Sequence, residues 1–369
     1  MSATDFRPKH RDIFFRLRDE IAAGRYRGER RLPTEAELVA RFGVSRPTVG
    51  RALRELQIEG LIERRRGAGT FLKEARAQGG GFFGLIIPDL GHTEIFEPMC
   101  AAMAHGAQSS GHTLLWGATS REGADAERWC GELIARGVHG VFFAPRELEG
   151  DHQRLNRAVA HRLRDAGVAV VLLDRDLAPF PARSDFDLVG IDNVRAGWEA
   201  ARHLVDQGAR RVRFVARPFS AATVDARIAG CREALVARDR DISGLVQLGD
   251  PKDPAFVRAV ATGAGAADGI VCANDLTAAE MIRGLTAAGL RVPRDVRVVG
   301  FDDVRYATLL TPTLTTMHQP VAELGAIALR AMRERVAEPT APAREIRLSA
   351  PLVVRESCGA APPPGKPRG

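Results

Sequence analysis

The segment from Ser45 to Arg51 combines hydroxyl groups and arginines at a spacing that suits contact with a polyanion. Ser45 can cap a helix, and Pro47 falls in the first turn, where its missing N–H costs little. Arg46, Thr48 and Arg51 then lie at or near the outward face of the first turns. Arginine can bind guanine through two hydrogen bonds when the start of a helix enters the major groove. The segment therefore predicts a helix that reads DNA.

A second group of polar side chains comes directly after predicted strands and has a different chemistry. Asp174 and Arg175 follow one strand, and Asp302 follows another. Each sugar hydroxyl both donates and accepts hydrogen bonds, so a carboxylate beside a guanidinium suits a polyhydroxyl ligand. The alternative role of a strand-end Asp or Asn is to cap the following helix. We expect this capping role for Asp192, Asn193 and Asp275.

The DNA-reading segment needs a scaffold, which its flanking sequence supplies. Thr34 is a plausible N-cap of a preceding helix, and Glu35 lies in a first turn that favours negative charge. The residues from Arg64 to Gly69 form a hairpin tip with three arginines, which can lie along phosphates or enter a minor groove. Together these features predict a winged helix-turn-helix. Its elements are a supporting helix at residues 8–24, helices from Thr34 to Gly43 and from Ser45 to Gly60, and strands at residues 61–63 and 70–72.

From Phe82 onward, short apolar strands alternate with amphipathic helices in two successive series. This alternation is typical of parallel sheets with helices on both faces, so we expect an α/β core of two similar lobes. In such sheets ligands bind beyond the carboxyl ends of the strands, where Asp174 and Asp302 lie. The predicted strands are residues 82–87, 113–118, 138–144, 168–174, 187–192, 211–216, 245–248, 269–273 and 296–302.

The charge of the 369-residue chain is unevenly distributed. The net charge is +7, and residues 1–76 account for all of it, which is an electrostatic footprint for polyanion binding. Five cysteines without a CxxC pair argue against a disulfide framework and a structural zinc site, so we expect no metal and no cofactor. There is no apolar signal-peptide core and no apolar run long enough to cross a membrane. We therefore expect a cytoplasmic protein.

Shifts in composition divide the chain into segments. Residues 1–73 form the predicted winged helix-turn-helix, and residues 74–81, which end in three glycines, form a flexible linker. Residues 82–357 form the predicted two-lobed core. The Pro- and Gly-rich end, residues 358–369, is predicted to be a disordered tail.

The N-terminal segment resembles the DNA-binding domain of the GntR family of bacterial repressors over roughly residues 8–73. The resemblance rests on the LPTE, VSRPTV and LRELQIEGLIERRRGAGTF runs. Family members often have arginine where this chain has Ala36 and Gly50, and Gly50 costs about 1 kcal/mol of helix propensity relative to Ala. In the family, residues that match Arg46, Thr48 and the wing near Gly67 touch DNA. The complete expected set of DNA contacts is Thr34, Glu35, Ser45, Arg46, Pro47, Thr48, Arg51, Arg65, Arg66 and Gly67.

Residues 82–357 resemble the effector-binding core of LacI-family repressors, which are kin to periplasmic sugar-binding proteins. Among the matching runs are VVLLDRDL at 170–177, DARIAGCREAL at 225–235 and TPTLTTMHQP at 311–320. The resemblance implies three chain crossings between lobes. It places residues 82–188 and 321–343 in lobe 1, and residues 189–318 and 344–357 in lobe 2.

The same resemblance implies a set of ligand contacts between the lobes, namely Asp174, Arg175, Arg227, Asn274, Asp302 and Gln319. In the family the loop after the first strand of the core sets specificity, and here it reads DLGHTEIF at residues 89–96. We take His92 and Glu94 from this loop as further ligand candidates. Phe96 is a candidate as well, since it could stack on a sugar face or belong to the core.

A GntR-type reader on a LacI-type core resembles the arabinose-repressor subgroup. LacI-family repressors usually place a hinge helix between reader and core, but the glycine triplet at residues 79–81 would break such a helix. We therefore expect the wing to replace the minor-groove contact of that helix.

These observations lead us to expect a homodimeric transcriptional repressor. Two readers would bind a pseudo-palindromic operator, and a sugar-like effector, in the simplest case a monosaccharide, would close the lobes and change operator affinity. One alternative is a corepressor-dependent regulator that binds a nucleobase or nucleoside. A second is a pyridoxal-phosphate enzyme fused to the reader, which needs a Schiff-base lysine, and Lys252 is the only lysine in residues 82–357. A third, a secreted sugar-binding protein, conflicts with the DNA reader and the absent signal peptide.

Overall fold

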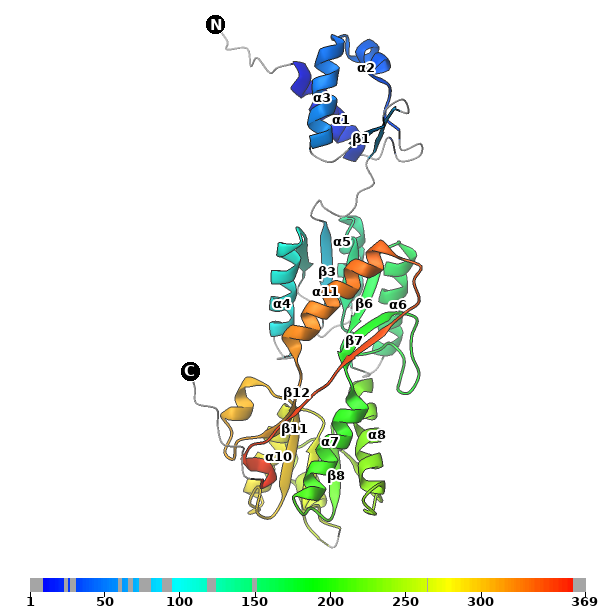
Figure 1. Ribbon diagram of the computed structural model, residues 1–369. Helices are drawn as coiled ribbons and strands as arrows, with labels where there is room; N and C mark the ends of the chain where they lie inside the picture. The colour runs from blue at the N-terminus through cyan, green and yellow to red at the C-terminus, as the bar shows by residue number, and fades with distance from the viewer. Residues whose placement is uncertain are drawn as a thin grey trace, which may run out of the picture. The chain divides into compact units, whose positions relative to one another are not determined.

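The structure is a computed structural model that describes residues 9–22, 26, 31–58, 62–65, 69–72, 81–87, 95–117, 124–147, 151–263 and 265–360. By its internal contacts the chain separates into two units, residues 1–80 and residues 81–369 (Figure 1). Each unit has buried apolar side chains of its own. Each therefore folds around its own core.

The first unit combines helices with a two-stranded hairpin. Helices α1 and α2 both pack against α3. Strands β1 and β2 are antiparallel, with Ile62 opposite Leu72. This arrangement confirms the predicted winged helix-turn-helix. The bounds are α1 (Lys9–Ala22), α2 (Glu35–Phe42), α3 (Arg46–Ile58), β1 (Ile62–Arg65) and β2 (Gly69–Leu72).

Local sequence explains where α2 and α3 lie. Thr34 Oγ1 accepts a hydrogen bond from the Glu37 N–H at 3.3 Å, and the Thr34 N–H donates to Glu37 Oε2 at 2.7 Å, so the two residues form a capping box. Gly43 ends α2 with a left-handed φ of 61°. The inward face of α3 is fully buried and consists of Val49, Ala52, Leu53 and Leu56. Arg51 and Arg54, on the opposite face of α3, are exposed. The predicted stop at Gly60 lies outside the described residues.

The second unit begins with a lobe built on a parallel sheet in the order β13-β7-β6-β5-β3-β4. Alternate side chains point to opposite faces, so Phe142 and Val171 share a core with α4 and α11, whereas Val141 and Val170 share one with α5 and α6. The bounds are β3 (Phe82–Ile86), α4 (Phe96–Ser109), β4 (Thr113–Trp116), α5 (Ala124–Ala135), β5 (Gly140–Phe143), α6 (His152–Asp165), β6 (Ala169–Leu173), β7 (Asp187–Ile191), α11 (Val321–Ala337) and β13 (Glu345–Leu348).

Lobe 2 repeats this plan with a sheet in the order β14-β12-β11-β10-β8-β9. Its strands are parallel except β14, which runs antiparallel to β12. The two parallel sheets confirm the predicted α/β core. The bounds are α7 (Asn193–Asp206), β8 (Val212–Ala216), α8 (Ala222–Val236), β9 (Val246–Leu248), α9 (Pro254–Ala261), β10 (Gly269–Cys272), α10 (Asp275–Ala287), β11 (Arg297–Asp302), the 3-10 helix η1 (Arg305–Thr308), β12 (Thr315–His318), β14 (Leu352–Val353) and the 3-10 helix η2 (Glu356–Cys358).

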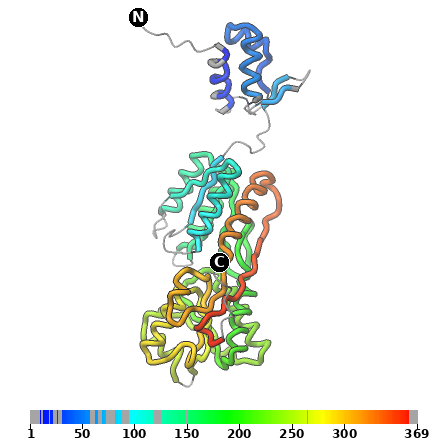
Figure 2. The backbone as a smooth tube through the Cα atoms, turned by 60° about the vertical axis from the view of Figure 1, so that its left-hand side comes forward, coloured from blue at the N-terminus to red at the C-terminus, as the bar shows by residue number. Residues whose placement is uncertain are grey.

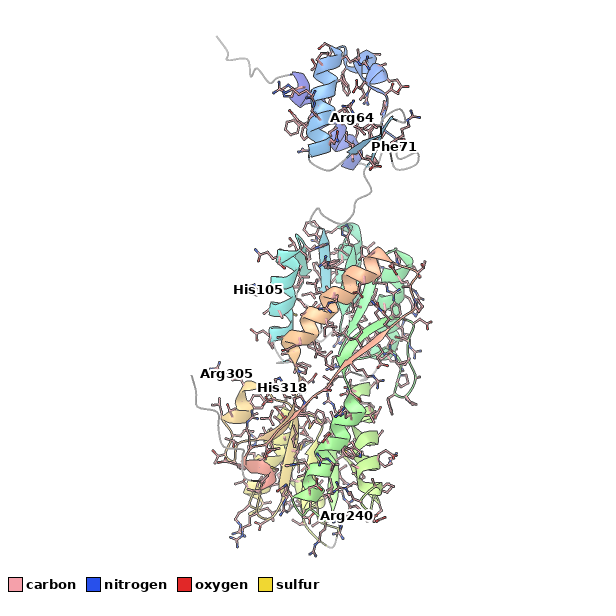
Figure 3. The ribbon with its side chains drawn as sticks, viewed as in Figure 1. Arg64, Phe71, His105, Arg240, Arg305 and His318 are labelled. Atoms are coloured by element: carbon pink, nitrogen blue, oxygen red, sulfur yellow. The ribbon has the colours of Figure 1, made fainter. Side chains whose placement is uncertain are left out.

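The chain passes from one lobe to the other where β7 leads to α7, where β12 leads to α11, and where β13 leads to β14 (Figure 2). His318, which ends β12, marks the second crossing in Figure 3. We expected residues 189–318 and 344–357 in lobe 2, but residues 189–191 belong to β7 of lobe 1. Val189 pairs with Leu173 of β6, and Gly190 and Ile191 pair with β13, whose residues 345–348 were also expected in lobe 2. Two crossings therefore fall a few residues later than predicted, because strand pairing decides which sheet an apolar segment joins.

Helices α7 and α8 approach each other closely in lobe 2 (Figure 1). A Cβ atom at Gly197 would lie 2.1 Å from the carbonyl oxygen of Arg227, and one at Gly230 would lie 1.8 Å from that of Val194. Any larger side chain at either glycine would force the two backbones apart. The start of α7, next to the first crossing, is thereby held against the part of α8 that contains Arg227.

Candidate functional site

Polar side chains from both lobes meet at the carboxyl ends of the strands. Asp174 follows β6 of lobe 1, Asp302 ends β11 of lobe 2, Arg227 lies on α8, and Gln319 follows β12. Asp174, Arg227 and Gln319 are buried, and Asp302 is partly buried. Gln319 Nε2 donates to Asp302 Oδ1 at 2.7 Å, and the charges of Asp302 and Asp174 both act on Arg227. We call Asp174, Arg227, Asp302 and Gln319 the polar cluster.

The guanidinium of Arg227 is fixed on several sides. Its Nε donates to Asn193 Oδ1 at 2.8 Å, its Nη1 donates to the Ala273 carbonyl at 2.6 Å, and its Cζ lies 4.2 Å from the centroid of the Phe301 ring. Asn193 was expected to cap a helix, and that expectation is wrong, because Asp192 takes the capping position with a bond from the Arg195 N–H. Asn193 instead orients Arg227. An Asn directly after the capping Asp was the only sequence signal for this role.

Two acceptors of the polar cluster have no hydrogen-bond partner among the described residues. They are Asp174 Oδ1 and Gln319 Oε1, and both atoms are buried. An unsatisfied buried polar group costs about 1–3 kcal/mol. Asp174 and Asp302 also adopt left-handed φ values of 63° and 111°, which a non-glycine residue rarely adopts. Donors from a hydroxyl-rich ligand would satisfy the two acceptors that the fold leaves open.

Burial also sets the protonation of the carboxyl groups here. Burial raises the pKa of Asp302 to about 6, although the charge of Arg227 and the bond from Gln319 oppose the shift. Burial and, to a lesser extent, the charge of Asp302 raise the pKa of Asp275 to about 8. The polar cluster therefore combines a permanent cation with a carboxyl group that can gain a proton in mildly acidic solution.

Asp275 was expected to cap α10, and this expectation is also wrong. Asn274 caps the helix, since its Oδ1 accepts from the Thr277 N–H at 2.8 Å. Asp275 lies buried in the first turn and accepts from Thr316 Oγ1 at 2.6 Å and from the Val304 N–H at 3.0 Å. It thus connects α10 to β12 and to the loop after β11.

Apart from Asn274, which caps α10, the other candidate ligand contacts divide into three groups. Arg175 is largely buried and donates to Asp174 Oδ2 at 3.2 Å and to the Pro145 carbonyl at 3.3 Å, so it braces Asp174. Phe96 is fully buried in the lobe 1 core with α4, so its role is packing and the ligand-stacking alternative is wrong. His92 and Glu94 lie outside the described residues.

A pocket adjoins the polar cluster and shares Asp174 with it. The pocket reaches across both lobes and is also lined by Asn193, the partner of Arg227. Apolar side chains from β7 and the first turns of α8 make up much of its wall. The wall residues from these elements are Leu188, Gly190, Ile191, Ala222, Thr223 and Ala226. The remaining wall comes from the loop after Asp174 and from β13.

In the first unit, the predicted DNA contacts lie on an exposed surface. The side chain of Arg46 is 80% exposed, and that of Arg51 is 69% exposed. Ser45 Oγ and Thr48 Oγ1 share a hydrogen bond of 2.8 Å, and Pro47 is exposed beside them. The start of α3 therefore offers cations and hydroxyl groups to solvent.

Glu35 joins the start of α3 to the hairpin. Its Oε2 accepts from Arg46 Nε at 3.1 Å, and its Oε1 pairs with Arg64 on β1, which is labelled in Figure 3. The bond from Arg46 lowers the pKa of Glu35 most, against the effect of burial. Thr34 takes part in the capping box. The Arg65 side chain, Arg66 and Gly67 lie outside the described residues.

Within the described ranges, no group of three or more His, Cys, Asp or Glu side chains could hold a metal ion. No helix in that part of the chain is long and apolar enough to cross a membrane.

Comparisons with known proteins identify both units. The family model for bacterial regulatory proteins of the gntR family matches residues 9–72, and the model for the periplasmic binding protein-like domain matches residues 201–358. The HTH-type transcriptional regulator CelR of Thermobifida fusca is 34% identical over 245 residues, which cover 65% of this chain and 69% of CelR. The chain belongs to the HTH-type transcriptional regulators.

This regulator combines a GntR-type DNA-binding domain with a LacI-type core. Its structure matches that of a transcriptional regulator CelR–cellobiose complex with a TM-score of 0.65 and 26% identity, over 88% of this chain and 100% of that one. The ribose operon repressor of Halalkalibacterium halodurans is 25% identical over 281 residues, which cover 75% of this chain and 79% of the repressor. These relatives are regulators of transcription, so the expectation of a regulator over an enzyme is confirmed.

Proposed function

We propose that this regulator is a homodimeric repressor whose operator affinity is controlled by a neutral sugar bound between the two lobes. The observation that carries the proposal is the pair of open, buried acceptors, Asp174 Oδ1 and Gln319 Oε1, beside the fixed cation of Arg227. Such a set of groups suits hydroxyl groups that donate and accept side by side. Ligand contact with both lobes would favour their closure.

The charge of the polar cluster supports a neutral ligand. Arg227 is its one cation, and Asp174 and Asp302 are both acidic. Arg175, which is paired with Asp174, brings the cations to two, so the two arginines are balanced by the two acids. A phosphate or carboxylate ligand would therefore add negative charge that no surplus cation offsets. Cellobiose in the CelR complex and ribose in the name of the ribose operon repressor make a sugar the first class to test. Asn274 and Arg175 would complete the contacts around it.

On the DNA side, we propose that Arg46, Thr48 and Arg51 contact bases and phosphates in the major groove. Arg65, Arg66 and Gly67 would form the wing contact. The concentration of net charge in residues 1–76 supports this assignment, since counterion release favours binding of a basic surface to DNA. A protein that acts on an operator works where the DNA lies, in the bacterial cytoplasm.

We propose that lobe 2 contributes to the dimer contact. Leu276 on α10 is 45% exposed, and Leu309 after η1 is 74% exposed. The bond from the Val304 N–H to Asp275 connects the residue before η1 to the start of α10. Exposed apolar side chains of this size favour association. A twofold dimer requires a twofold operator.

Selection from a library of random DNA duplexes with the full-length protein tests the proposal. We expect a pseudo-palindromic site, bound with an affinity that falls as salt increases. The selected duplex then serves in fluorescence anisotropy against a panel of sugars, and at least one neutral sugar is expected to release it. A coupling of about 1–3 kcal/mol corresponds to a 5–150-fold change in operator affinity.

The controls separate the parts of the proposal. A selected half-site in single copy, or a monomer by analytical ultracentrifugation, would contradict the dimer and leave the rest intact. If no duplex is enriched, the repressor assignment fails. If nucleosides act on the protein–DNA complex and sugars do not, the effector class is a nucleoside.

A further inference from the structure

The pocket beside the polar cluster extends in a direction that the polar cluster does not cover. Asp174 lines the pocket, whereas Arg227, Asp302 and Gln319 do not. Asp174 therefore stands between a polar half and a mostly apolar half of one inter-lobe site. A single ring bound to Asp302 and Gln319 would leave the apolar half unfilled.

The apolar half contains an aromatic side chain that nothing in the proposed function uses. Phe180, in the loop after β6, lines the pocket and is 37% exposed. It lines the same pocket as Ala222 and Ala226 on α8, so lobe 1 supplies an aromatic ring and lobe 2 supplies small side chains to one pocket. An aromatic ring in a ligand pocket can pack against a flat apolar face of the ligand, such as the C–H face of a pyranose, and so orient the ligand.

The charged residues at the outer end of the pocket neutralise one another. Arg183 Nη1 lies 2.7 Å from Asp176 Oδ2 and 3.4 Å from Glu345 Oε1, and Arg347 Nη2 lies 2.8 Å from Glu345 Oε1. These pairs leave no surplus positive charge for an anionic group. The pocket thus suits a neutral group that has an apolar face and hydroxyl groups at its edges.

We infer that the effector contains at least two linked sugar rings, the first in the polar cluster and the second in this pocket against Phe180. This inference rests on the proposed function, because it assigns the effector to the same inter-lobe site. Thr223, which lines the pocket on the side of lobe 2, is placed to meet a hydroxyl of the second ring. Phe180 then determines ring number and does not affect whether sugars bind at all.

Matched sugar pairs test the inference on the full-length protein. Isothermal titration compares cellobiose and maltose with glucose, xylobiose with xylose, and lactose with galactose, alongside ribose and adenosine. We expect at least one disaccharide to bind about tenfold or more tightly than its own monosaccharide. In Phe180→Ala this advantage is expected to disappear, while monosaccharide affinity changes less than about twofold. Phe180→Trp, which keeps an aromatic face, is expected to retain most of it.

Phe219 provides a matched control, because it is 67% exposed in lobe 2 and does not line the pocket. Phe219→Ala should leave both affinities unchanged, and thermal unfolding of each variant checks that the core still folds. The inference is overturned, with the proposed function intact, if a monosaccharide binds as tightly as every disaccharide. Equal loss of both sugars in Phe180→Ala, or the same loss in Phe219→Ala, overturns it too. If adenosine binds more tightly than every sugar, the inference of a second sugar ring is overturned, because the effector then contains a base. If nothing in the panel binds, the sugar effector itself is wrong and the inference falls with it.

Discussion

The DNA-binding surface and the polar cluster both place an arginine near acidic side chains, yet they do so in opposite surroundings. Arg46 is 80% exposed and bonded to Glu35, whereas Arg227 is 4% exposed and bonded to Asn193 and a backbone carbonyl. An exposed ion pair contributes about 0–1 kcal/mol, so Arg46 can leave Glu35 for a base or phosphate at little cost. Arg227 has no such freedom. One surface is adaptable and salt-sensitive, and the other is rigid and shielded from salt.

We expect the largest effect from a substitution in the buried polar cluster. Asp302→Ala removes a carboxylate from beside Arg227 and deprives Gln319 of its 2.7 Å partner. Losing one member of a buried charged set costs several kcal/mol, so sugar affinity should fall roughly 100-fold or more. Isothermal titration measures this loss. Operator affinity without sugar should stay within a factor of about two, and a variant that still responds normally to sugar would show that the polar cluster is not the effector site.

Arg46→Ala should have the next largest effect, on the exposed side. Loss of a bidentate base contact is expected to weaken binding to the selected operator roughly 5–150-fold, since such a contact is worth about 1–3 kcal/mol. Sugar affinity should not change. Arg16→Ala, an exposed arginine on α1 with the same change in charge, is the control. If both variants lose the same affinity, Arg46 contributes charge and not base recognition.

A change of pH should have a smaller effect on the polar cluster than these substitutions. Because burial raises the pKa of Asp302 to about 6, its carboxylate is lost as pH falls through that value. Sugar affinity is expected to drop about tenfold between pH 7 and pH 5, and Asp302→Asn should flatten the profile. The folded core holds this proton more tightly than the unfolded chain, so the contribution of Asp302 to stability decreases as pH rises from about 4 to 6. Titration calorimetry and chemical denaturation measure these effects.

Gly50→Ala should give the smallest effect. Gly50 lies within α3, and a Cβ atom there would meet nothing within 4 Å. The change should raise the unfolding free energy of the first unit by about 1 kcal/mol through helix propensity. Scanning calorimetry should detect this as a higher transition for that unit alone. An unchanged transition, or one that moves for the core, would argue against independent folding of the two units.

The sequence predicted the positions of helices and strands well, because hydrophobic period and capping residues are local properties. The capping box at Thr34 and the buried stripe on α3 are examples. The lobe boundaries at residues 189–191 and 345–348 were not predictable in this way, since apolar strands fit either sheet and only pairing decides between them.

Residues of the candidate site could be predicted where the local sequence marks them. They could not be predicted where their role depends on residues that are distant in sequence. Asp174 and Asp302 were predicted from their positions after strands, and Arg227 and Gln319 from the resemblance. Their use as ligand contacts remains a prediction, as does the arabinose-repressor subgroup. Asp275 and Asn193 were expected to cap helices, because Asp and Asn are both good caps. Their actual partners, Thr316 and Arg227, are distant in sequence. The pocket beside Phe180 has no linear signature, since both lobes build it.

The close contacts at Gly197 and Gly230 bear on how sugar binding could change the arrangement of the two lobes. Because the backbones of α7 and α8 are in close contact, the two helices cannot slide past each other and are expected to move as one rigid body. Helix α7 begins at Asn193, beside the first crossing, and Arg227 on α8 is hydrogen-bonded to Asn193. A movement of Arg227 would then carry Asn193 and the start of α7, which lie beside the first crossing, along with it. Bulkier residues at these two glycines would move α8 away from α7 and separate Arg227 from Asn193, so sugar binding and its effect on the crossing would both be weakened.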